Sequence, residues 1–196
     1  FPNHPADPSN IDNLKEIIKL VKERDLDFGV AFDGDADRAV FIDDTGKVIS
    51  GSMMTTLIAD YLSEKNDNLK VVYNVNVSPH ALSILDSKNI SLHRCKVGHS
   101  NIKAMMKELE ADFGGEHSAH FYYKDNYFAD SAILTLLMFM TIITERGEKV
   151  SSMIDKYNFP PSSGEINYVV EDVESSLEKI KTVFTGDFDE LDGLSY

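Results

Sequence analysis

Apolar and polar side chains alternate at the beginning of the chain in patterns that distinguish helix from strand. Residues 10–22 carry apolar side chains at helical spacing, with Asn10 placed to cap the helix. Residues 28–32 form a continuous apolar run, which is typical of a strand covered on both faces. Residues 39–42 and 47–50 flank an Asp-Asp-Thr-Gly turn, and this arrangement predicts a hairpin.

Further along the chain, helical and strand patterns follow one another in regular order. The expected elements are a helix at 53–64, a strand at 71–75, a helix from 79, a strand at 91–95, a helix from 100, two short strands within 113–123 and a buried helix at 130–145. Such alternation favours an α/β fold with a mixed, mostly parallel sheet that carries helices on both faces.

A proline- and serine-rich segment at residues 160–164 is the best candidate for a linker. Beyond it, residues 164–170 alternate like a strand and residues 174–184 have a helical pattern. We therefore expect one complete domain between two incomplete ones, divided as residues 1–47, 48–159 and 160–196.

Composition and charge narrow the function. The 196 residues include 33 acidic and 19 basic side chains, a net charge of −14, which argues against a nucleic-acid binder but permits a small anionic substrate. The longest apolar stretch, residues 132–143, is too short to cross a membrane, and the single Cys95 cannot form an intrachain disulfide. With no signal peptide and no initiator methionine at Phe1, we expect a cytoplasmic piece of a larger protein.

The sharpest local feature is the sequence Asp-Gly-Asp-Ala-Asp-Arg that follows the predicted strand at 28–32. Asp33, Asp35 and Asp37 can converge on one hard cation such as Mg²⁺ or Ca²⁺, because carboxylate oxygens suit these ions. Arg38 adds a guanidinium group that can bind a phosphate through two hydrogen bonds. A solvated acidic turn is the plainer interpretation, but α/β proteins place their ligands at the ends of buried strands.

Three other interpretations of this loop are considered. A calcium-binding helix–loop–helix would need glycine in place of Arg38, a glutamate in place of Asp44 and flanking helices, so it is rejected. A phosphatase of the haloacid-dehalogenase type would use Asp33 as its nucleophile, although Asp37 stands where that class carries threonine or valine. A non-catalytic module that binds a metal or a sugar phosphate also remains open.

Two further loops carry candidate chemistry. Lys96 and His99 lie between a predicted strand and a helix, where Ser100 is placed to cap the helix and an anion would be favoured.

In the second loop, Glu116 and Ser118 alternate along an expected extended stretch and could bind sugar hydroxyls, and His120 falls on the same side. A polar hairpin is the plainer interpretation. Lys124, Asp125 and Asp130 are interpreted as surface or capping residues.

Taken together, these segments resemble the α-D-phosphohexomutase family, and in particular the bacterial phosphomannomutase/phosphoglucomutase enzymes. The resemblance rests on Phe-Pro-Asn-His-Pro-Ala-Asp-Pro at residue 1 and on the loops at 33–38, 96–100 and 114–120, in this order and spacing. It spans nearly the whole chain and implies the end of domain 2, all of domain 3 and the start of domain 4. It also implies that domain 1 and the rest of domain 4 belong to the same polypeptide.

The resemblance implies a phosphoryl transfer between the 1 and 6 positions of a hexose phosphate, through a phosphoserine and a bisphosphate intermediate. Asp33, Asp35 and Asp37 match the family's Mg²⁺ loop, and Arg38 matches its phosphate-contacting arginine.

In the other two loops, Glu116 and Ser118 match the sugar-binding residues and His120 matches a histidine near the proton transfers. Lys96 and His99 lie in the loop that resembles the sugar-phosphate contact.

The chain also departs from the family pattern. Ala36 and Ala119 replace glycines, which matters if those positions need a positive φ, and Asn76 replaces a lysine proposed in acid–base work. With that lysine replaced, His120 is the best candidate for the general base. No Thr-x-Ser-His-Asn-Pro phosphoserine loop and no Arg-x-Ser-Asn phosphate clamp are present, so we expect the chain to be inactive by itself.

Overall fold

The computed structural model describes all residues except 89, 165, 167 and 196. It divides into two compact units, Phe1–Phe159 and Pro160–Tyr196. Among the described residues, no helix combines the length and the apolar character that crossing a membrane would require.

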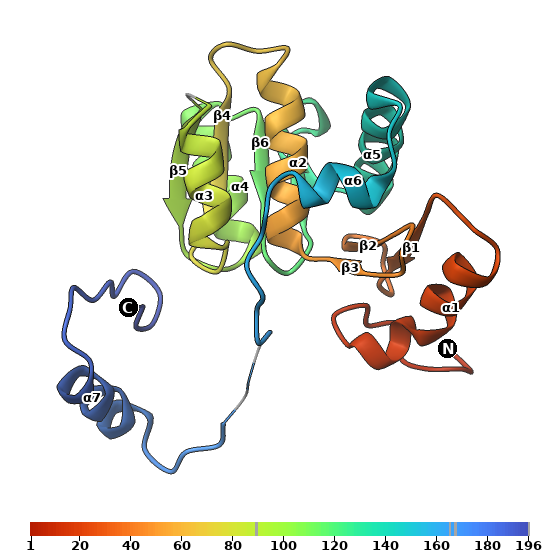
Figure 1. Cartoon of the computed structure of the whole chain (residues 1–196). Coiled ribbons are helices and arrows are strands. Elements are labelled where there is room, and N and C mark those ends of the chain that lie inside the picture. The colour runs from red at the N-terminus through yellow and green to blue at the C-terminus, as the bar shows by residue number, and fades with distance from the viewer. Residues whose placement is uncertain (89, 165, 167, 196) are drawn as a thin grey trace. The chain divides into compact units, whose positions relative to one another are not determined.

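The N-terminal part of the first unit is a helix packed on a small antiparallel sheet (Figure 1). Its elements are η1 (Ile11–Leu14), α1 (Lys15–Glu23), β1 (Phe28–Phe32), β2 (Ala39–Asp43) and β3 (Val48–Ile49), with the strands in the order β1-β2-β3. Asn10 caps the first helical turn by accepting a hydrogen bond from the Asp12 amide, and the predicted hairpin joins β2 to β3.

Residues 28–32 are covered on both faces, as expected, although β1 is an edge strand. Phe28, Val30 and Phe32 pack against the core cluster that includes Phe139, and they are partly buried. Gly29 is buried on the opposite face, and β1 pairs with β2 alone among the described residues. Gly29 faces α1 so closely that an added Cβ would lie 2.9 Å from Ile17 Cγ1. A continuous apolar run cannot by itself distinguish a central strand from this arrangement.

The rest of the first unit is a mixed five-stranded sheet with helices on both faces, which confirms the predicted fold class. Its strands are β4 (Lys70–Asn74), β5 (Ser91–Cys95), β6 (Phe113–Gly115), β7 (Phe121–Tyr123) and β8 (Ala129–Asp130), in the order β5-β4-β6-β7-β8. Its helices are α2 (Gly51–Ser63), α3 (Pro79–Asp86), α4 (His99–Leu109), α5 (Ala132–Arg146) and α6 (Val150–Asp155). Only β7 runs opposite to the other four strands.

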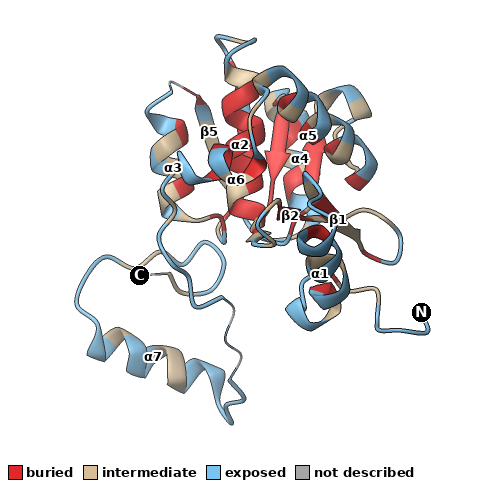
Figure 2. Ribbon diagram, turned by 45° about the vertical axis from the view of Figure 1, so that its right-hand side comes forward, coloured by how far each residue is buried: buried red, intermediate tan, exposed pale blue. Residues whose placement is uncertain are grey.

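Neighbouring residues of one strand point into two different cores. Val71 belongs to the core cluster that includes residues of α2, α3 and α5, whereas Val72 belongs to the cluster that includes Ile102 and Met106 of α4. This alternation is the period of two that a pleated strand imposes. Figure 2 shows buried residues concentrated in α2 and in the central strands of the five-stranded sheet, whereas the edge strand β5 is mostly not buried.

A buried carboxylate connects α2 to the last residue of α5 and to residues just beyond α3 and α6. Asp60 of α2 forms ion pairs with Lys88 and with Arg146 of α5, and it accepts a hydrogen bond from the Tyr157 hydroxyl at 2.5 Å. Burial opposes the ionisation of Asp60, but hydrogen bonds from Lys88 and Tyr157 outweigh it and lower its pKa.

The helix predicted at 130–145 forms as α5, but it is buried on one face only. Phe139 is fully buried, with its ring centroid 4.5 Å from that of Phe41, whereas Leu137 and Met140 are 54% and 46% exposed. The expectation of a buried helix at 130–145 therefore holds for one face of the helix and is wrong for the other. Because apolar residues occur all around this helix, its sequence does not show which face packs against β2 and α2.

The second unit contains the predicted helix as α7 (Val173–Val183), capped by Asp172, and none of its residues is buried. The predicted strand at 164–170 is not seen in residues 164, 166 and 168–170, and residues 165 and 167 lie outside the described residues.

Two alanines have a left-handed backbone at the positions where the resembling family carries glycine. Ala36 has φ 60° and Ala119 has φ 69°. This conformation costs an L-residue about 1–2 kcal/mol, because Cβ crowds the following carbonyl oxygen. Both loops therefore keep a glycine-like backbone without glycine.

Candidate functional site

The acidic loop and the loop at 116–120 lie side by side. Arg38 and His120 form an isolated antiparallel bridge, and the Ala39 amide donates to the Ala119 carbonyl at 3.2 Å. On the other side, the Ala132 amide donates to the Ala36 carbonyl at 3.3 Å, which fixes the acidic loop against the start of α5. Two segments that are distant in the sequence thus form one polar surface.

Asp33 organises the acidic loop from a nearly buried position. Its Oδ1 accepts hydrogen bonds from the amides of Asp37 and Arg38, both at 3.1 Å, and its Oδ2 accepts one from Arg38 Nε at 2.8 Å. Burial opposes the ionisation of Asp33, but these hydrogen bonds outweigh it and lower the pKa of Asp33 to about 2. The carboxylate is therefore ionised over the physiological range.

Asp33, Asp35 and Asp37 fit a hard cation. Each offers a carboxylate oxygen, and these oxygens lie within 4.8 Å of one another. Opposite ligands of one Mg²⁺ ion are about 4.2 Å apart, so a small closure of the loop would suffice. Burial and the neighbouring Asp33 carboxylate raise the pKa of Asp37, and Asp35 adds to this effect. Crowded carboxylates of this kind are stabilised by a cation between them.

His120 is paired with a carboxylate that the sequence interpretation missed. Its Nδ1 lies 3.2 Å from Asp130 Oδ2 and 3.8 Å from Asp37 Oδ1. Lys103 of α4 reaches the same carboxylate, with its Nζ 2.7 Å from Asp130 Oδ1. Burial opposes the ionisation of Asp130, but the Lys103 hydrogen bond outweighs it and lowers the pKa of Asp130.

The interpretation of Asp130 as a surface or capping residue is wrong. Its side chain is 9% exposed, and the α5 cap is Ser131, whose hydroxyl accepts from the Leu134 amide. Asp130 lies at the end of a strand, directly before the residue that caps α5, and this position could have indicated a place in the site. Lys103, within a helix of ordinary composition, gave no signal.

Glu116 is held by three hydrogen bonds at the end of β6. It accepts from the Tyr122 hydroxyl at 2.5 Å, from Asn74 Nδ2 at 2.9 Å and from Ser118 Oγ at 3.2 Å. Burial, together with the hydrogen bond to Glu116, raises the pKa of Tyr122. Glu116 itself is 2% exposed, and one of the roughly four acceptor positions of its carboxylate is left over.

The expected extended stretch from Glu116 to His120 is instead a tight turn. The Ala119 amide donates to the Glu116 carbonyl at 3.2 Å, and the Glu116 amide donates to the His120 carbonyl at 3.0 Å. The alternation of sides predicted for Glu116, Ser118 and His120 therefore does not hold, since a turn has no period of two. The positive φ of Ala119 completes this turn.

The first residues of α2 pack directly against this turn. A Cβ added to Gly51 would lie 2.3 Å from the His117 carbonyl oxygen and 2.4 Å from the Glu116 carbonyl oxygen. The next residue, Ser52, is buried and its Oγ lies 2.9 Å from His117 Nδ1. Close backbone approach therefore requires glycine at residue 51.

Lys96 and His99 are exposed at the same sheet edge, because β4, β5 and β6 are parallel and end together. Among the described residues, no hydrogen bond or ion pair joins them to the acidic loop. Ser100 does not cap α4, which begins one residue earlier behind Gly98, a residue with φ 117°. Asn76 follows β4, and its amide donates to Asn74 Oδ1 at 3.3 Å.

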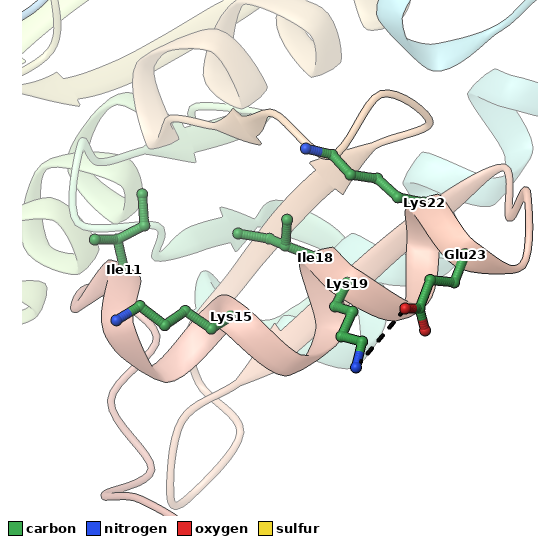
Figure 3. Close-up of a pocket in the computed structure, with 6 residues that line it drawn as sticks. All are labelled: Ile11, Lys15, Ile18, Lys19, Lys22 and Glu23. Atoms are coloured by element: carbon green, nitrogen blue, oxygen red, sulfur yellow. Dashed lines mark ion pairs between the residues drawn. The ribbon is translucent and has the colours of Figure 1, made fainter.

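A separate hollow of about 620 Å³ runs along α1 and shares no residue with these loops. Figure 3 shows its lining, with Lys19 paired to Glu23. The lining residues are Ile11, Lys15, Ile18, Lys19, Lys22 and Glu23. It lies on the opposite side of α1 from Ile17, which packs on Gly29, and we assign it no part in the site.

Comparison with known proteins places this geometry in a family. Residues 50–158 match the alpha/beta/alpha domain III of phosphoglucomutase/phosphomannomutase, and residues 1–46 match its domain II. A phosphomannomutase of Methanocaldococcus jannaschii is 35% identical over the whole of this chain, which covers 44% of that protein. The chain thus spans less than half the length of the curated relatives it matches.

Solved structures agree with this assignment. A phosphoglucomutase/phosphomannomutase family protein of Burkholderia thailandensis matches 98% of this chain and 42% of its own, with 25% identity and a TM-score of 0.81. An N-acetylphosphoglucosamine mutase of Aspergillus fumigatus, solved with GlcNAc-6P and magnesium, shares the fold at 12% identity and a TM-score of 0.57 over 79% of this chain and 40% of its own. The chain therefore belongs to the phosphoglucomutase/phosphomannomutase family, the α-D-phosphohexomutases.

Proposed function

We propose that this chain supplies the metal-binding and sugar-binding loops of a phosphohexomutase that interconverts hexose 1-phosphate and hexose 6-phosphate. The observation that carries the proposal is the backbone bridge between Arg38 and His120, which joins the two loops. Family membership supports it, since the relatives include enzymes named phosphomannomutase. Within this reading, residues 1–47, 48–159 and 160–196 belong to domains 2, 3 and 4.

Asp33, Asp35 and Asp37 would hold the metal ion, which we take to be Mg²⁺. The ion would supply positive charge beside the phosphoryl group in transfer. The three carboxylates suit Mg²⁺ by ligand type and spacing, and the crystallised mutase of Aspergillus fumigatus holds magnesium. Arg38 uses Nε to hold Asp33, which leaves its terminal nitrogens to contact a phosphate.

The loop at 116–120 would orient the sugar. Glu116 keeps one acceptor position, and Ser118 keeps its lone pairs while donating to Glu116. Lys96 and His99, at the end of β5, would meet the substrate's other phosphate. Few contacts suit a site that must accept the sugar in two orientations.

His120 is the proposed general base. Because the ionised Asp130 carboxylate only accepts hydrogen bonds, the proton of the His120–Asp130 contact belongs to His120 Nδ1. The unprotonated Nε2 is then the atom that can take a proton from a sugar hydroxyl. Lys103 holds Asp130 in place and is a positioning residue.

The phosphoryl carrier would be a serine on another part of the polypeptide, as the family resemblance implies. It would give its phosphoryl group to the sugar phosphate, which forms a bisphosphate. The bisphosphate would then reorient in the site and return its other phosphoryl group to the serine. Without a nucleophile, the loops of this chain cannot accelerate the transfer. We therefore expect the 196-residue chain neither to isomerise nor to hydrolyse mannose 1-phosphate.

The alternative of a phosphatase with Asp33 as nucleophile fits less well. Asp33 Oδ1 accepts two hydrogen bonds and Oδ2 accepts one, so Oδ2 keeps an acceptor position for a small metal ion. The side chain is 4% exposed, which leaves a phosphate group little access for in-line attack by this carboxylate. Phosphate release from mannose 1-phosphate with Mg²⁺, abolished by Asp33→Asn, would establish that alternative.

The metal assignment is tested by calorimetry with Mg²⁺ on three proteins. We expect heat of binding for the wild type, a loss of at least about tenfold in affinity for Asp35→Asn, and no change for Asp125→Asn. Asp125 is a matched control because it is also an exposed aspartate but lies outside the acidic loop. Equal affinities for wild type and Asp35→Asn would refute the site.

A further inference from the structure

The turn of the sugar-binding loop carries an exposed histidine that the proposed function leaves unused. His117 lies between Glu116 and Ser118, and its Nδ1 is 2.9 Å from Ser52 Oγ. Ser52 belongs to the first turn of α2 and is 1% exposed. Its Oγ also accepts a hydrogen bond from the Ser78 amide at 3.0 Å.

These contacts decide which nitrogen of His117 carries the proton. If Nδ1 were protonated, it would donate to Ser52 Oγ, and the Ser52 hydroxyl proton would be buried without an acceptor among the described residues. A buried donor without a partner costs about 1–3 kcal/mol. If Nδ1 is unprotonated, the Ser52 hydroxyl donates to it and every group is satisfied. The neutral ring then carries its proton on Nε2.

The other side chains of this turn lack a free donor. Glu116 only accepts, and Ser118 donates its single hydroxyl proton to Glu116. A sugar hydroxyl can donate to these acceptors, but a phosphate oxygen, or a hydroxyl oxygen that accepts, needs a donor from the protein. Within residues 116–118 the His117 ring supplies it from an exposed position.

We propose that His117 is a further substrate-binding residue, whose Nε2–H donates to an oxygen of the bound hexose phosphate. Ser52 is the positioning residue that fixes this tautomer. The inference rests on the proposed function, because it assigns a contact within the same sugar-binding loop. The accepting oxygen belongs either to a ring hydroxyl or to a phosphate, and the two are separated by the choice of probe.

The tautomer is tested first, without any ligand. Long-range ¹H–¹⁵N correlation spectra of the ¹⁵N-histidine-labelled chain should show His117 protonated at Nε2 and unprotonated at Nδ1 at neutral pH. Ser52→Ala should shift the His117 ring nitrogens toward a mixture of tautomers. Ser91→Ala is the control, because Ser91 Oγ lies 3.0 Å from His93 Nε2 in an exposed pair on β5.

A wild-type spectrum with His117 protonated at Nδ1 would overturn the inference. That measurement needs no variant, so it stands even if Ser52→Ala fails to fold. If the Ser52→Ala protein folds and its His117 spectrum is unchanged, the positioning role proposed for Ser52 is refuted.

Binding is tested by titrating the same labelled chain with mannose 1-phosphate, mannose and inorganic phosphate. We expect the His117 Nε2 signal to move with mannose 1-phosphate and with whichever of the other two probes carries the accepting oxygen. His117→Ala should weaken mannose 1-phosphate binding by about tenfold, which corresponds to the loss of one hydrogen bond. His117→Gln should restore most of it, since the glutamine amide places an N–H donor near the position of Nε2.

The outcomes separate the inference from the proposed function. The same titration of a uniformly ¹⁵N-labelled chain reports the backbone amides of the loop. Movement of the Glu116 and Ser118 amides without any change at His117 Nε2 would refute the inference and leave the sugar-binding loop supported. No movement anywhere in the loop would refute both. An affinity of His117→Ala equal to that of the wild type would also refute the inference.

Discussion

Replacing Gly51 by alanine should destabilise the protein, although helix propensity alone predicts the reverse. Gly51 is the first residue of α2, and alanine in a helix is favoured over glycine by up to about 1 kcal/mol. The added Cβ would lie 2.3 Å and 2.4 Å from two backbone carbonyl oxygens, those of His117 and Glu116. Neither oxygen is the end of a flexible side chain, so the loop or the helix must move.

Overpacking of this kind costs about 1–3 kcal/mol. For a chain of this length, each kcal/mol changes Tm by about 2–4 °C, so we expect a fall of about 2–12 °C. The displaced turn should also weaken mannose 1-phosphate binding, because Glu116 and Ser118 lie in it. Differential scanning calorimetry and a binding titration measure the two effects.

Gly34→Ala is the matched control for stability. Its added Cβ would meet the nearest atoms at 3.9 Å and 4.0 Å, which is ordinary contact. We expect the Tm of this variant to stay within about 2 °C of the wild type, in line with a surface substitution. A Gly51→Ala protein as stable as the wild type, or more stable, would refute the close approach of α2 to the sugar-binding loop.

Three further predictions concern single side chains. Ala36→Gly should raise the free energy of unfolding by up to about 1 kcal/mol in denaturant titrations, because relief of the left-handed strain exceeds the added flexibility of the unfolded chain. Tyr122→Phe should lower it by about 1.5–3 kcal/mol, the range for a hydrogen bond to a charged group such as Glu116. Asp60 has a lowered pKa in the folded state, so its stabilisation is present above its unfolded value of about 4 and is lost as the pH falls through the lower folded value. The stability of Asp60→Asn should therefore change less than that of the wild type between about pH 5 and pH 2.

The sequence predicted most elements because their patterns are local. The hairpin between β2 and β3 follows from an Asp-Asp-Thr-Gly turn, in which Asp43 Oδ1 accepts from the amides of Thr45 and Lys47 at 2.9 Å. The sequence showed that alanine replaces glycine at residues 36 and 119, but it did not show whether these positions have a positive φ, as the structure does. Which face of α5 packs was not predictable, because apolar residues occur all around that helix.

The missed parts of the site depend on contacts between distant residues. The Asp130 carboxylate pairs with His120, which directly precedes β7, and with Lys103 of α4. These partners come together only when β8 pairs with β7 at the edge of the sheet. The Ser52–His117 pair joins residues 65 positions apart. Spacing along the chain cannot reveal such pairs, since no local period links them.

The central claim is that the acidic loop and the sugar-binding loop form one site. Linkage tests it directly, because two ligands that stabilise each other must raise each other's affinity by the same factor. The measurement is the calorimetric affinity of the chain for Mg²⁺ with and without saturating mannose 1-phosphate. We predict an increase of about fivefold or more, matched by an equal increase in mannose 1-phosphate affinity when Mg²⁺ is saturating. An affinity for Mg²⁺ that mannose 1-phosphate leaves unchanged would contradict the account.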